Sequence, residues 1–139
     1  MKIIIVYLIL LILIVKCINT KSSNCPCNPS TVENKYCYSN WVAHVQILNR
    51  SNSRYKVKII KMYKGVQGKA ELISPPQSSC GVFLENGNEY LISASYGFNL
   101  NTKFLSECRI NLKWNQVSKK LKEKLNNGEI DKYCKINNF

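Results

Sequence analysis

Three cysteines stand close together in the stretch CPCNPSTVENKYC, residues 25–37. The sequence has seven cysteines, six of them after an apolar leader, and an even number in so short a chain indicates a disulfide framework. Long loops closed by such bridges can each contribute about 4 kcal/mol in the chain-entropy model. We therefore expect a single domain over residues 25–139, held by three disulfides whose pairing these spacings leave open. Three cysteines lie early and three lie late: Cys25, Cys27, Cys37, Cys80, Cys108 and Cys134.

An unbroken apolar run, residues 3–15, follows Lys2 ahead of this framework. Its length is typical of the hydrophobic region of a secretory signal and is too short to span a bilayer comfortably. We predict that a signal peptide and any short extension occupy residues 1–24, with cleavage between residues 17 and 24, so that Cys17 leaves with the signal. A retained anchor is the alternative. The prediction is a secreted, extracellular protein without a membrane span in its mature form.

The chain is strongly basic, with 20 Lys and Arg against 8 Asp and Glu and a net charge of +12. Removing residues 1–24 takes away three lysines and no acid, which leaves +9. Such an excess favours acidic partners, among them glycosaminoglycans, although a solvated basic surface is the simpler interpretation. Lysines are densest in two stretches: Lys56, Lys58, Lys61, Lys64 and Lys69, and Lys119, Lys120, Lys122 and Lys124.

The patterning of apolar residues predicts a mainly β protein with flanking helices. β-branched and aromatic residues predict strands over residues 41–48, 55–63, 70–74, 81–84 and 89–94, and five short strands suggest a barrel or a sandwich. Asn28-Pro29 resembles a helix cap with proline in the first turn, which predicts one short helix toward Cys37. A helical period over residues 115–127 predicts a final helix that ends at Gly128.

Side chains for catalysis are scarce. His44 is the only histidine and lies within a strand pattern, so neither a histidine metal cluster nor a Ser/His/Asp triad can be built around it. The acidic residues are scattered, and no pair is spaced for acid-base work. We therefore expect no enzyme activity. Asn49-Arg50-Ser51 is the usable glycosylation sequon, which makes Asn49 a candidate modification site in a secreted chain.

The cysteines and the residues around them resemble a known family, the amino-terminal netrin-like domain of the tissue inhibitors of metalloproteinases. Besides the C-x-C start and Cys37, the similarity rests on residues 60–65, 79–82 and 89–92, on Cys108 and Cys134, and on Trp114 with the residues that follow it. It extends from Cys25 to Cys134. The family's second, carboxy-terminal cysteine-rich domain has no counterpart in this sequence.

The resemblance implies an OB-fold-like barrel of five strands with flanking helices, and the bridges Cys25–Cys80, Cys27–Cys108 and Cys37–Cys134. It also implies a mechanism in which the amine and carbonyl of Cys25 chelate the catalytic zinc of a target metalloproteinase. The inhibitor then needs no cofactor of its own and contacts zinc only in trans. We use the name inhibitory wedge for the residues to which the family's roles carry over: Cys25, Pro26, Cys27, Asn28, Ser78, Ser79 and Cys80.

Two features of this chain bear on that mechanism. Proline at position 26 fixes φ, removes an amide donor and reaches only shallowly into a pocket, so affinity or selectivity differs from relatives with a small hydroxyl residue there. Cleavage after Cys17 or Thr20 would leave residues such as 21–24 ahead of Cys25 and turn the chelating amine into an amide, which is a very poor zinc ligand. A cut directly before Cys25 instead puts Asn24 at an atypical last signal position.

The leading hypothesis is therefore a secreted, monomeric inhibitor of matrix-type zinc metalloproteinases. The alternative is a netrin-like binding module that attaches to glycosaminoglycan or extracellular matrix through its lysines and inhibits nothing. Nucleic-acid binding by an OB-fold is disfavoured, because the signal sequence and the disulfides place the chain outside the cell.

Overall fold

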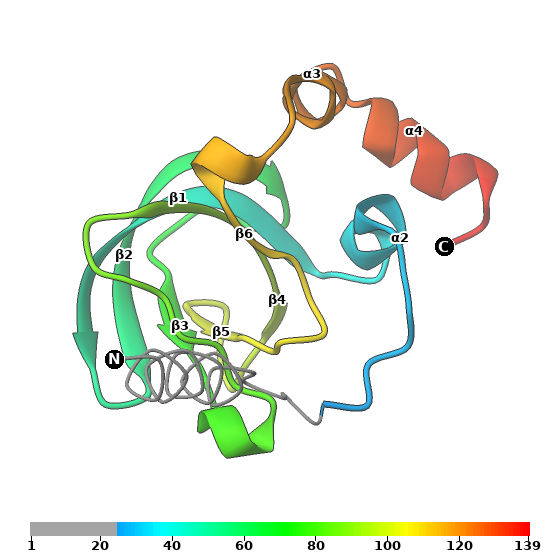
Figure 1. Ribbon diagram of the computed structural model, residues 1–139. Helices are drawn as coiled ribbons and strands as arrows, with labels where there is room; N and C mark the ends of the chain where they lie inside the picture. The colour runs from blue at the N-terminus through cyan, green and yellow to red at the C-terminus, as the bar shows by residue number, and fades with distance from the viewer. Residues whose placement is uncertain (1–24) are drawn as a thin grey trace, which may run out of the picture.

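A computed structural model describes residues 25–139 and shows a closed five-stranded β-barrel with helices on one side (Figure 1). The sheet order is β1-β2-β3-β5-β4-β6, and β1 also pairs with β4, which closes the barrel and leaves β6 as an added strand. β3 and β5 pair in parallel and the other neighbours are antiparallel. The strands are β1 (Trp41–Ser51), β2 (Arg54–Lys64), β3 (Glu71–Ile73), β4 (Glu89–Tyr96), β5 (Thr102–Phe104) and β6 (Asn111–Lys113).

Short helices flank this barrel. Two are single 3-10 turns, η1 (Gln77–Ser79) and η2 (Trp114–Gln116). Three are α-helical: α2 (Val32–Cys37), α3 (Lys119–Asn126) and α4 (Glu129–Ile136). None of the helices within residues 25–139 has the length and apolarity that a membrane crossing needs. The predicted signal peptide lies outside the described residues.

β1 supplies two cores because successive side chains of a strand point to opposite faces. Trp41, Ala43 and Val45 are fully buried inside the barrel, together with Tyr55 of β2 and Ile92 of β4. The intervening residues face the helices. A second apolar cluster fills the space between barrel and helices: Tyr36, Val42, Leu91, Ile110, Val117, Leu125 and Ile130.

The helical side is fastened by a disulfide and by polar contacts. Cys37 of α2 is bridged to Cys134 of α4, with 5.4 Å between their Cα atoms. The Tyr36 hydroxyl donates to Asp131 of α4 at 2.8 Å, and burial together with that carboxylate raises the tyrosine pKa. α2 is thereby held between the barrel and the end of the chain.

The predicted fold class, an OB-fold-like barrel of five strands with flanking helices and three disulfides, is confirmed. The strands predicted over residues 41–48, 55–63, 70–74 and 89–94 are present with small shifts at their ends. The strand predicted over residues 81–84 is wrong. The barrel uses β5 in its place, and β6 is an addition that the strand pattern did not indicate.

Residues 81–84 form no strand because side-chain hydroxyls take up the hydrogen bonds that a strand would make with a neighbour. The Val82 N–H donates to Ser74 Oγ at 2.8 Å, and the Leu84 N–H donates to the Tyr55 hydroxyl at 3.2 Å. Leu84 is buried and Phe83 is exposed, yet the N–H groups of Val82 and Leu84 are bonded to single side chains and not to a neighbouring strand. It runs across the barrel as an extended loop.

The helix predictions need two corrections. The first helix is capped by Thr31, whose hydroxyl accepts from the Asn34 N–H at 3.1 Å, so Asn28 is not its cap. The helix predicted over residues 115–127 begins later than expected, because residues 114–116 form η2 and Ser118 caps α3, and it ends before Gly128 as predicted. α4 lies beyond that stop and was not predicted, and it begins directly after Gly128, which has φ of 70°.

A salt bridge between α2 and α3 gives a pH-dependent prediction. Lys124 Nζ lies 2.9 Å from Glu33 Oε1, and this hydrogen bond lowers the pKa of the Glu33 carboxyl. A lowered carboxyl pKa stabilises the fold above the ordinary glutamate pKa, and the contribution is lost as the pH falls through the lowered value. Glu33→Gln should therefore cost about 0.5 kcal/mol of unfolding free energy at pH 7 and almost nothing near pH 3.

Denaturant unfolding at the two pH values measures this difference. Glu123→Gln, on the exposed face of α3, is the matched control and should change little at either pH. An equal loss from Glu33→Gln at both pH values would assign the effect to packing and reject the ion pair.

Candidate functional site

The segment from Cys25 to Asn28 has no regular secondary structure and is held by two disulfides. Cys25 is bridged to Cys80 with 5.5 Å between Cα atoms, and Cys27 is bridged to Cys108 with 5.2 Å between them. These are the pairs that the family resemblance implies. Pro26 and Asn28 are exposed. The segment is thus an accessible strip whose backbone is fixed at two neighbouring points.

A tight turn surrounds Pro26. The Cys27 N–H donates to the Cys25 carbonyl oxygen at 2.7 Å, which closes a three-residue turn with proline at its centre. Proline suits this position because its ring fixes φ and it has no N–H to satisfy. A carbonyl oxygen has two lone pairs, so the Cys25 oxygen can still accept a second ligand.

The loop that carries Cys80 is compact and leaves room only for glycine at one position. The N–H groups of Ser79 and Gly81 both donate to the Pro76 carbonyl, at 2.8 and 3.0 Å. Cys80 itself has a left-handed backbone, with φ of 62°. A Cβ on Gly81 would lie 1.7 Å from the Pro75 carbonyl oxygen. Ser78 and Ser79 are exposed on this loop, beside the bridge to Cys25.

Residues 105–108 form a third segment, which supports the Cys80 loop and Cys27. The Glu107 N–H donates to the Cys80 carbonyl at 2.8 Å, and the Leu105 N–H donates to the Ile73 carbonyl of β3 at 2.8 Å. Cys108 follows directly and holds Cys27. The seven residues assigned to the inhibitory wedge therefore lie together, although they come from two segments separated by some fifty positions of sequence.

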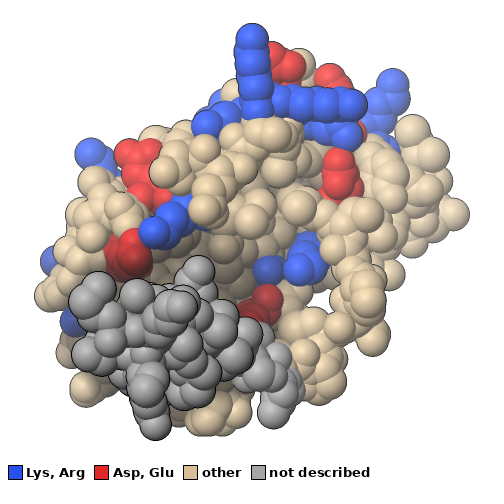
Figure 2. Space-filling view, in the orientation of Figure 1, with Lys and Arg blue, Asp and Glu red and all other residues tan. Residues whose placement is uncertain are grey.

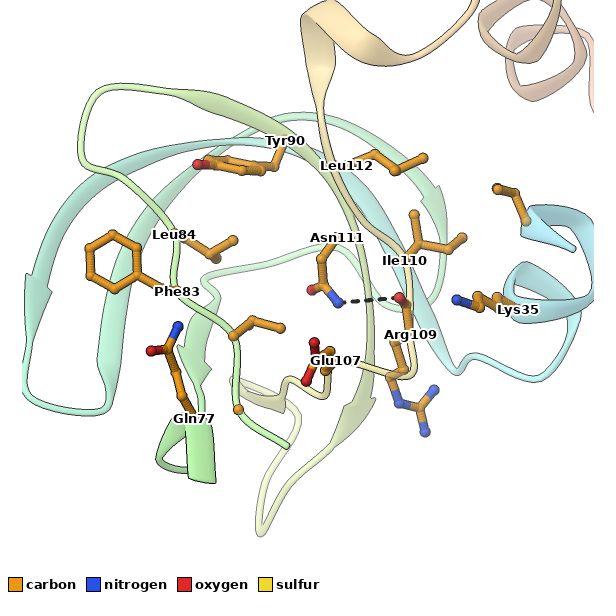
Figure 3. Close-up of a pocket in the computed structure, with 13 residues that line it drawn as sticks. Lys35, Gln77, Phe83, Leu84, Tyr90, Glu107, Arg109, Ile110, Asn111 and Leu112 are labelled. Carbon is orange, nitrogen blue, oxygen red and sulfur yellow. Dashed lines mark hydrogen bonds between the residues drawn. The ribbon is translucent and has the colours of Figure 1, made fainter. Parts of the chain in front are cut away.

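An open hollow of about 510 Å³ lies beside this region (Figure 3). Phe83, Leu84 and Tyr90 form an apolar wall, and Figure 3 shows them across from Glu107 and Arg109. Asn111 donates from Nδ2 to the carbonyls of Ser106 and Arg109, at 2.7 and 3.2 Å, which shapes the turn after Cys108. The hollow separates the Cys80 loop from β6.

The oxidation state of the cysteine sulfurs argues against a resident metal beside the inhibitory wedge. Sγ atoms of Cys25, Cys27 and Cys108 lie within 4.8 Å of one another. All three are in disulfides, so none is the thiolate that binds zinc. This cysteine group is the one cluster among residues 25–139 with suitable spacing for a metal.

The contacts of His44 hold elements of the fold together. Its ring is buried, accepts or donates a 2.8 Å hydrogen bond with Glu89, and stacks on Trp114 with 3.7 Å between ring centroids. The stack joins β1 to η2. Asn49, the predicted glycosylation site, is exposed on β1 beside Lys56 of β2.

The two lysine-rich stretches meet in space. Lys61 of β2 donates from Nζ to Asn126 of α3 at 2.7 Å, which joins them on one surface. Figure 2 shows Lys and Arg side chains gathered at the edge of the molecule where α3 lies in Figure 1. We call this surface the basic face. It comprises Lys61 of β2 with Lys119, Lys120 and Lys122 of α3.

Two basic residues near the wedge belong to no site that the sequence predicts. Lys35 and Arg109 line the hollow of Figure 3 and a second one next to it. They are two of 20 basic residues, and neither lies in a basic stretch. Only the folded chain brings them together.

Comparison with known proteins adds a family and two relatives. The family model described as tissue inhibitor of metalloproteinase matches residues 23–138. Metalloproteinase inhibitor 2 of Oryctolagus cuniculus is 28% identical over 131 residues, which cover 81% of this chain and 67% of the relative. The protein of the same name from Bos taurus is 27% identical over 135 residues, covering 84% and 61%. The chain thus spans about two thirds or less of these relatives' length.

A solved structure is also similar. Ancylostoma ceylanicum Excretory-Secretory Protein 2 aligns with a TM-score of 0.48 and 17% sequence identity, over 73% of this chain and 98% of that one.

Proposed function

The chain belongs to the tissue inhibitor of metalloproteinase family, and from this membership we propose that it is a secreted inhibitor of zinc metalloproteinases and not an enzyme. One observation carries the proposal. The exposed strip from Cys25 to Asn28 is clamped by two adjacent disulfides, which is the form that a rigid inserting segment needs. Rigidity favours tight binding because little conformational freedom is lost on association.

In the proposed mechanism the amine and the carbonyl oxygen of Cys25 bind the zinc of the target and displace its water. The two atoms form a five-membered chelate that suits the open coordination position of a catalytic zinc. Pro26 enters the main specificity pocket of the proteinase. Asn28, Ser78 and Ser79 line the ridge beside it, and the Cys25–Cys80 bridge keeps the two parts in register.

This mechanism requires a free amine on Cys25. We therefore propose that secretion removes residues 1–24 in full and leaves residues 25–139 as a single inhibitor domain. The zinc belongs to the target, so the inhibitor has no cofactor of its own. Matrix-type metalloproteinases are the proposed targets, bound by a monomer.

Amino-terminal sequencing of the secreted protein, together with titration against the catalytic domain of a matrix-type metalloproteinase, tests the proposal. We expect Cys25 as the first residue and full inhibition at one inhibitor per enzyme. A protein that begins at Cys25 and leaves the proteinase active at equimolar concentration would contradict it.

The basic face supports a second candidate function, attachment to sulfated glycosaminoglycan. The contact between Lys61 and Asn126 makes one continuous surface from two stretches of sequence. Lys124 is bound to Glu33, and the remaining lysines of α3 form no ion pair with residues 25–139. A polyanion would be attracted to them through screened Coulomb forces.

Substituting the three lysines of α3 that belong to the basic face, Lys119, Lys120 and Lys122, by glutamine should lower the salt concentration at which the protein elutes from heparin. Inhibition of the metalloproteinase should stay unchanged, because α3 lies on the helical side of the barrel and the wedge lies at the Cys80 loop (Figure 1). Lys132→Gln with Lys135→Gln, on α4, is the control for loss of charge alone. Equal elution of all three proteins would contradict a dedicated basic face.

A further inference from the structure

A second hollow, of about 720 Å³, adjoins the wedge on the side of α2. We call it the wedge hollow. Its walls are Asn28, Pro29, Tyr38 and Phe104, with Lys35 and Arg109 also lining it. Every ionisable side chain among its lining residues that is charged at neutral pH is a cation, since the lining includes no aspartate or glutamate.

Arg109 is held in this hollow without a counter-charge. Its Nη1 donates to Ser39 Oγ at 3.1 Å, and its Nη2 donates to Ser95 Oγ. Neither hydroxyl neutralises it, and Arg109 makes no ion pair with any carboxylate of residues 25–139. Burial lowers the pKa of the guanidinium, which reflects the cost of an uncompensated charge in a partly dry site.

Lys35 adds a second free cation. It projects from α2 and, like Arg109, lines both the wedge hollow and the hollow of Figure 3. It too forms no ion pair within residues 25–139. A partly buried guanidinium whose orientation is fixed by hydroxyls, in a hollow that a lysine also lines, is suited to bind a carboxylate with charge-assisted hydrogen bonds.

The position of the hollow points to its partner. Asn28 belongs both to the wedge and to the wall of the hollow, and Cys108, which also lines the hollow, holds Cys27. A proteinase that receives the wedge therefore comes close to the hollow as well. The exposed ring of Tyr38 and the half-buried ring of Phe104 give this mouth apolar edges.

We propose that the wedge hollow is a carboxylate-binding subsite that accepts an aspartate or glutamate side chain from the target proteinase, at the surface beside its active-site cleft. This inference rests on the proposed inhibitory function, and it adds a chemical requirement on the target. Proteinases with an acidic residue at that place should be preferred over those with a neutral or basic one.

The first experiment uses the secreted protein alone, with NMR signals of the hollow observed during titration. The probe is N-acetyl-glutamate N-methylamide, and the matched neutral probe is the glutamine analogue. We expect saturable shifts at Asn34, Ser95 and Phe104 with the glutamate probe only, and their loss in Arg109→Gln. Equal shifts with both probes, or shifts that survive Arg109→Gln, would overturn the subsite. Tighter binding of a sulfated heparin disaccharide would overturn it in favour of a polysaccharide.

The second experiment measures the inhibition constant for a matrix-type metalloproteinase with an acidic residue beside its cleft. Arg109→Gln and Lys35→Gln should each raise it roughly tenfold or more, because the carboxylate loses a charged partner. Of the two, Lys35→Gln should disturb folding less, since the Lys35 ammonium forms no ion pair within residues 25–139. Lys132→Gln, exposed on α4, is the control and should leave the constant unchanged.

The outcomes separate the two proposals. Wild-type inhibition that neither substitution weakens would overturn the subsite and leave the inhibitory function intact. A wild-type protein that inhibits no metalloproteinase would overturn the inhibitory function, and with it the proteinase as the source of the carboxylate.

Discussion

One alanine added ahead of Cys25 should abolish most inhibition of a zinc metalloproteinase and leave the domain folded. The addition converts the free amine of Cys25 into an amide, which is a very poor zinc ligand, and it places extra atoms where the chelate must form. Loss of a metal bond together with a steric block should cost several kcal/mol, which corresponds to about a thousandfold or more in the inhibition constant.

The comparison needs three proteins that begin at Cys25, at an added alanine, and at Cys25 with an acetylated amine. The last two should be equally inactive, because both lack the amine. An alanine added after Phe139 is the matched control and should have no effect. Thermal unfolding of all four should coincide, since the three disulfides hold the fold. Equal potency with and without the leading alanine would reject chelation by Cys25, and the glycosaminoglycan-binding module would become the better hypothesis.

Much of the barrel could be predicted because its long strands are rich in β-branched and aromatic residues, and that composition is a local signal. β1 is buried on both faces, with Trp41, Ala43 and Val45 inside the barrel and Val42 against the helices, so its burial shows no period of two. β5 and β6 are three residues each, too short to give such a signal. Val82 and Leu84 are apolar, as strand residues often are. Their N–H groups are nevertheless bonded to the hydroxyls of Ser74 and Tyr55, and sequence patterns do not reveal such bonds.

The cysteine pairing at the proposed site could be predicted only through the family resemblance. Nothing local brings Cys25 to Cys80 or Cys27 to Cys108, since these bridges close 55 and 81 positions of sequence. The same holds for Arg109 and Lys35, which become notable through the absence of a carboxylate partner among the described residues. Whether a cation has a carboxylate partner depends on the folded structure, and composition does not reveal it.

Among glycine-to-alanine substitutions, Gly81→Ala should lower both stability and inhibition the most. The added Cβ would lie 1.7 Å from the Pro75 carbonyl oxygen and 2.8 Å from that of Pro76, so the loop must move. The clash involves backbone atoms, which cannot rotate away as a side chain can. We expect a loss of about 3 kcal/mol of unfolding free energy, measured by denaturant titration.

The same change should weaken inhibition beyond its effect on stability, because Cys80 precedes Gly81 and carries the bridge that positions Cys25. Gly87→Ala is the matched control. Gly87 has φ of 81° with nothing within 4 Å of its absent Cβ, so alanine there adds backbone strain of about 1 kcal/mol and no clash. Its inhibition constant, measured where both variants are fully folded, should equal that of the wild type. If Gly81→Ala inhibits equally well under those conditions, the Cys80 loop does not position the wedge, and Cys27–Cys108 alone must hold it.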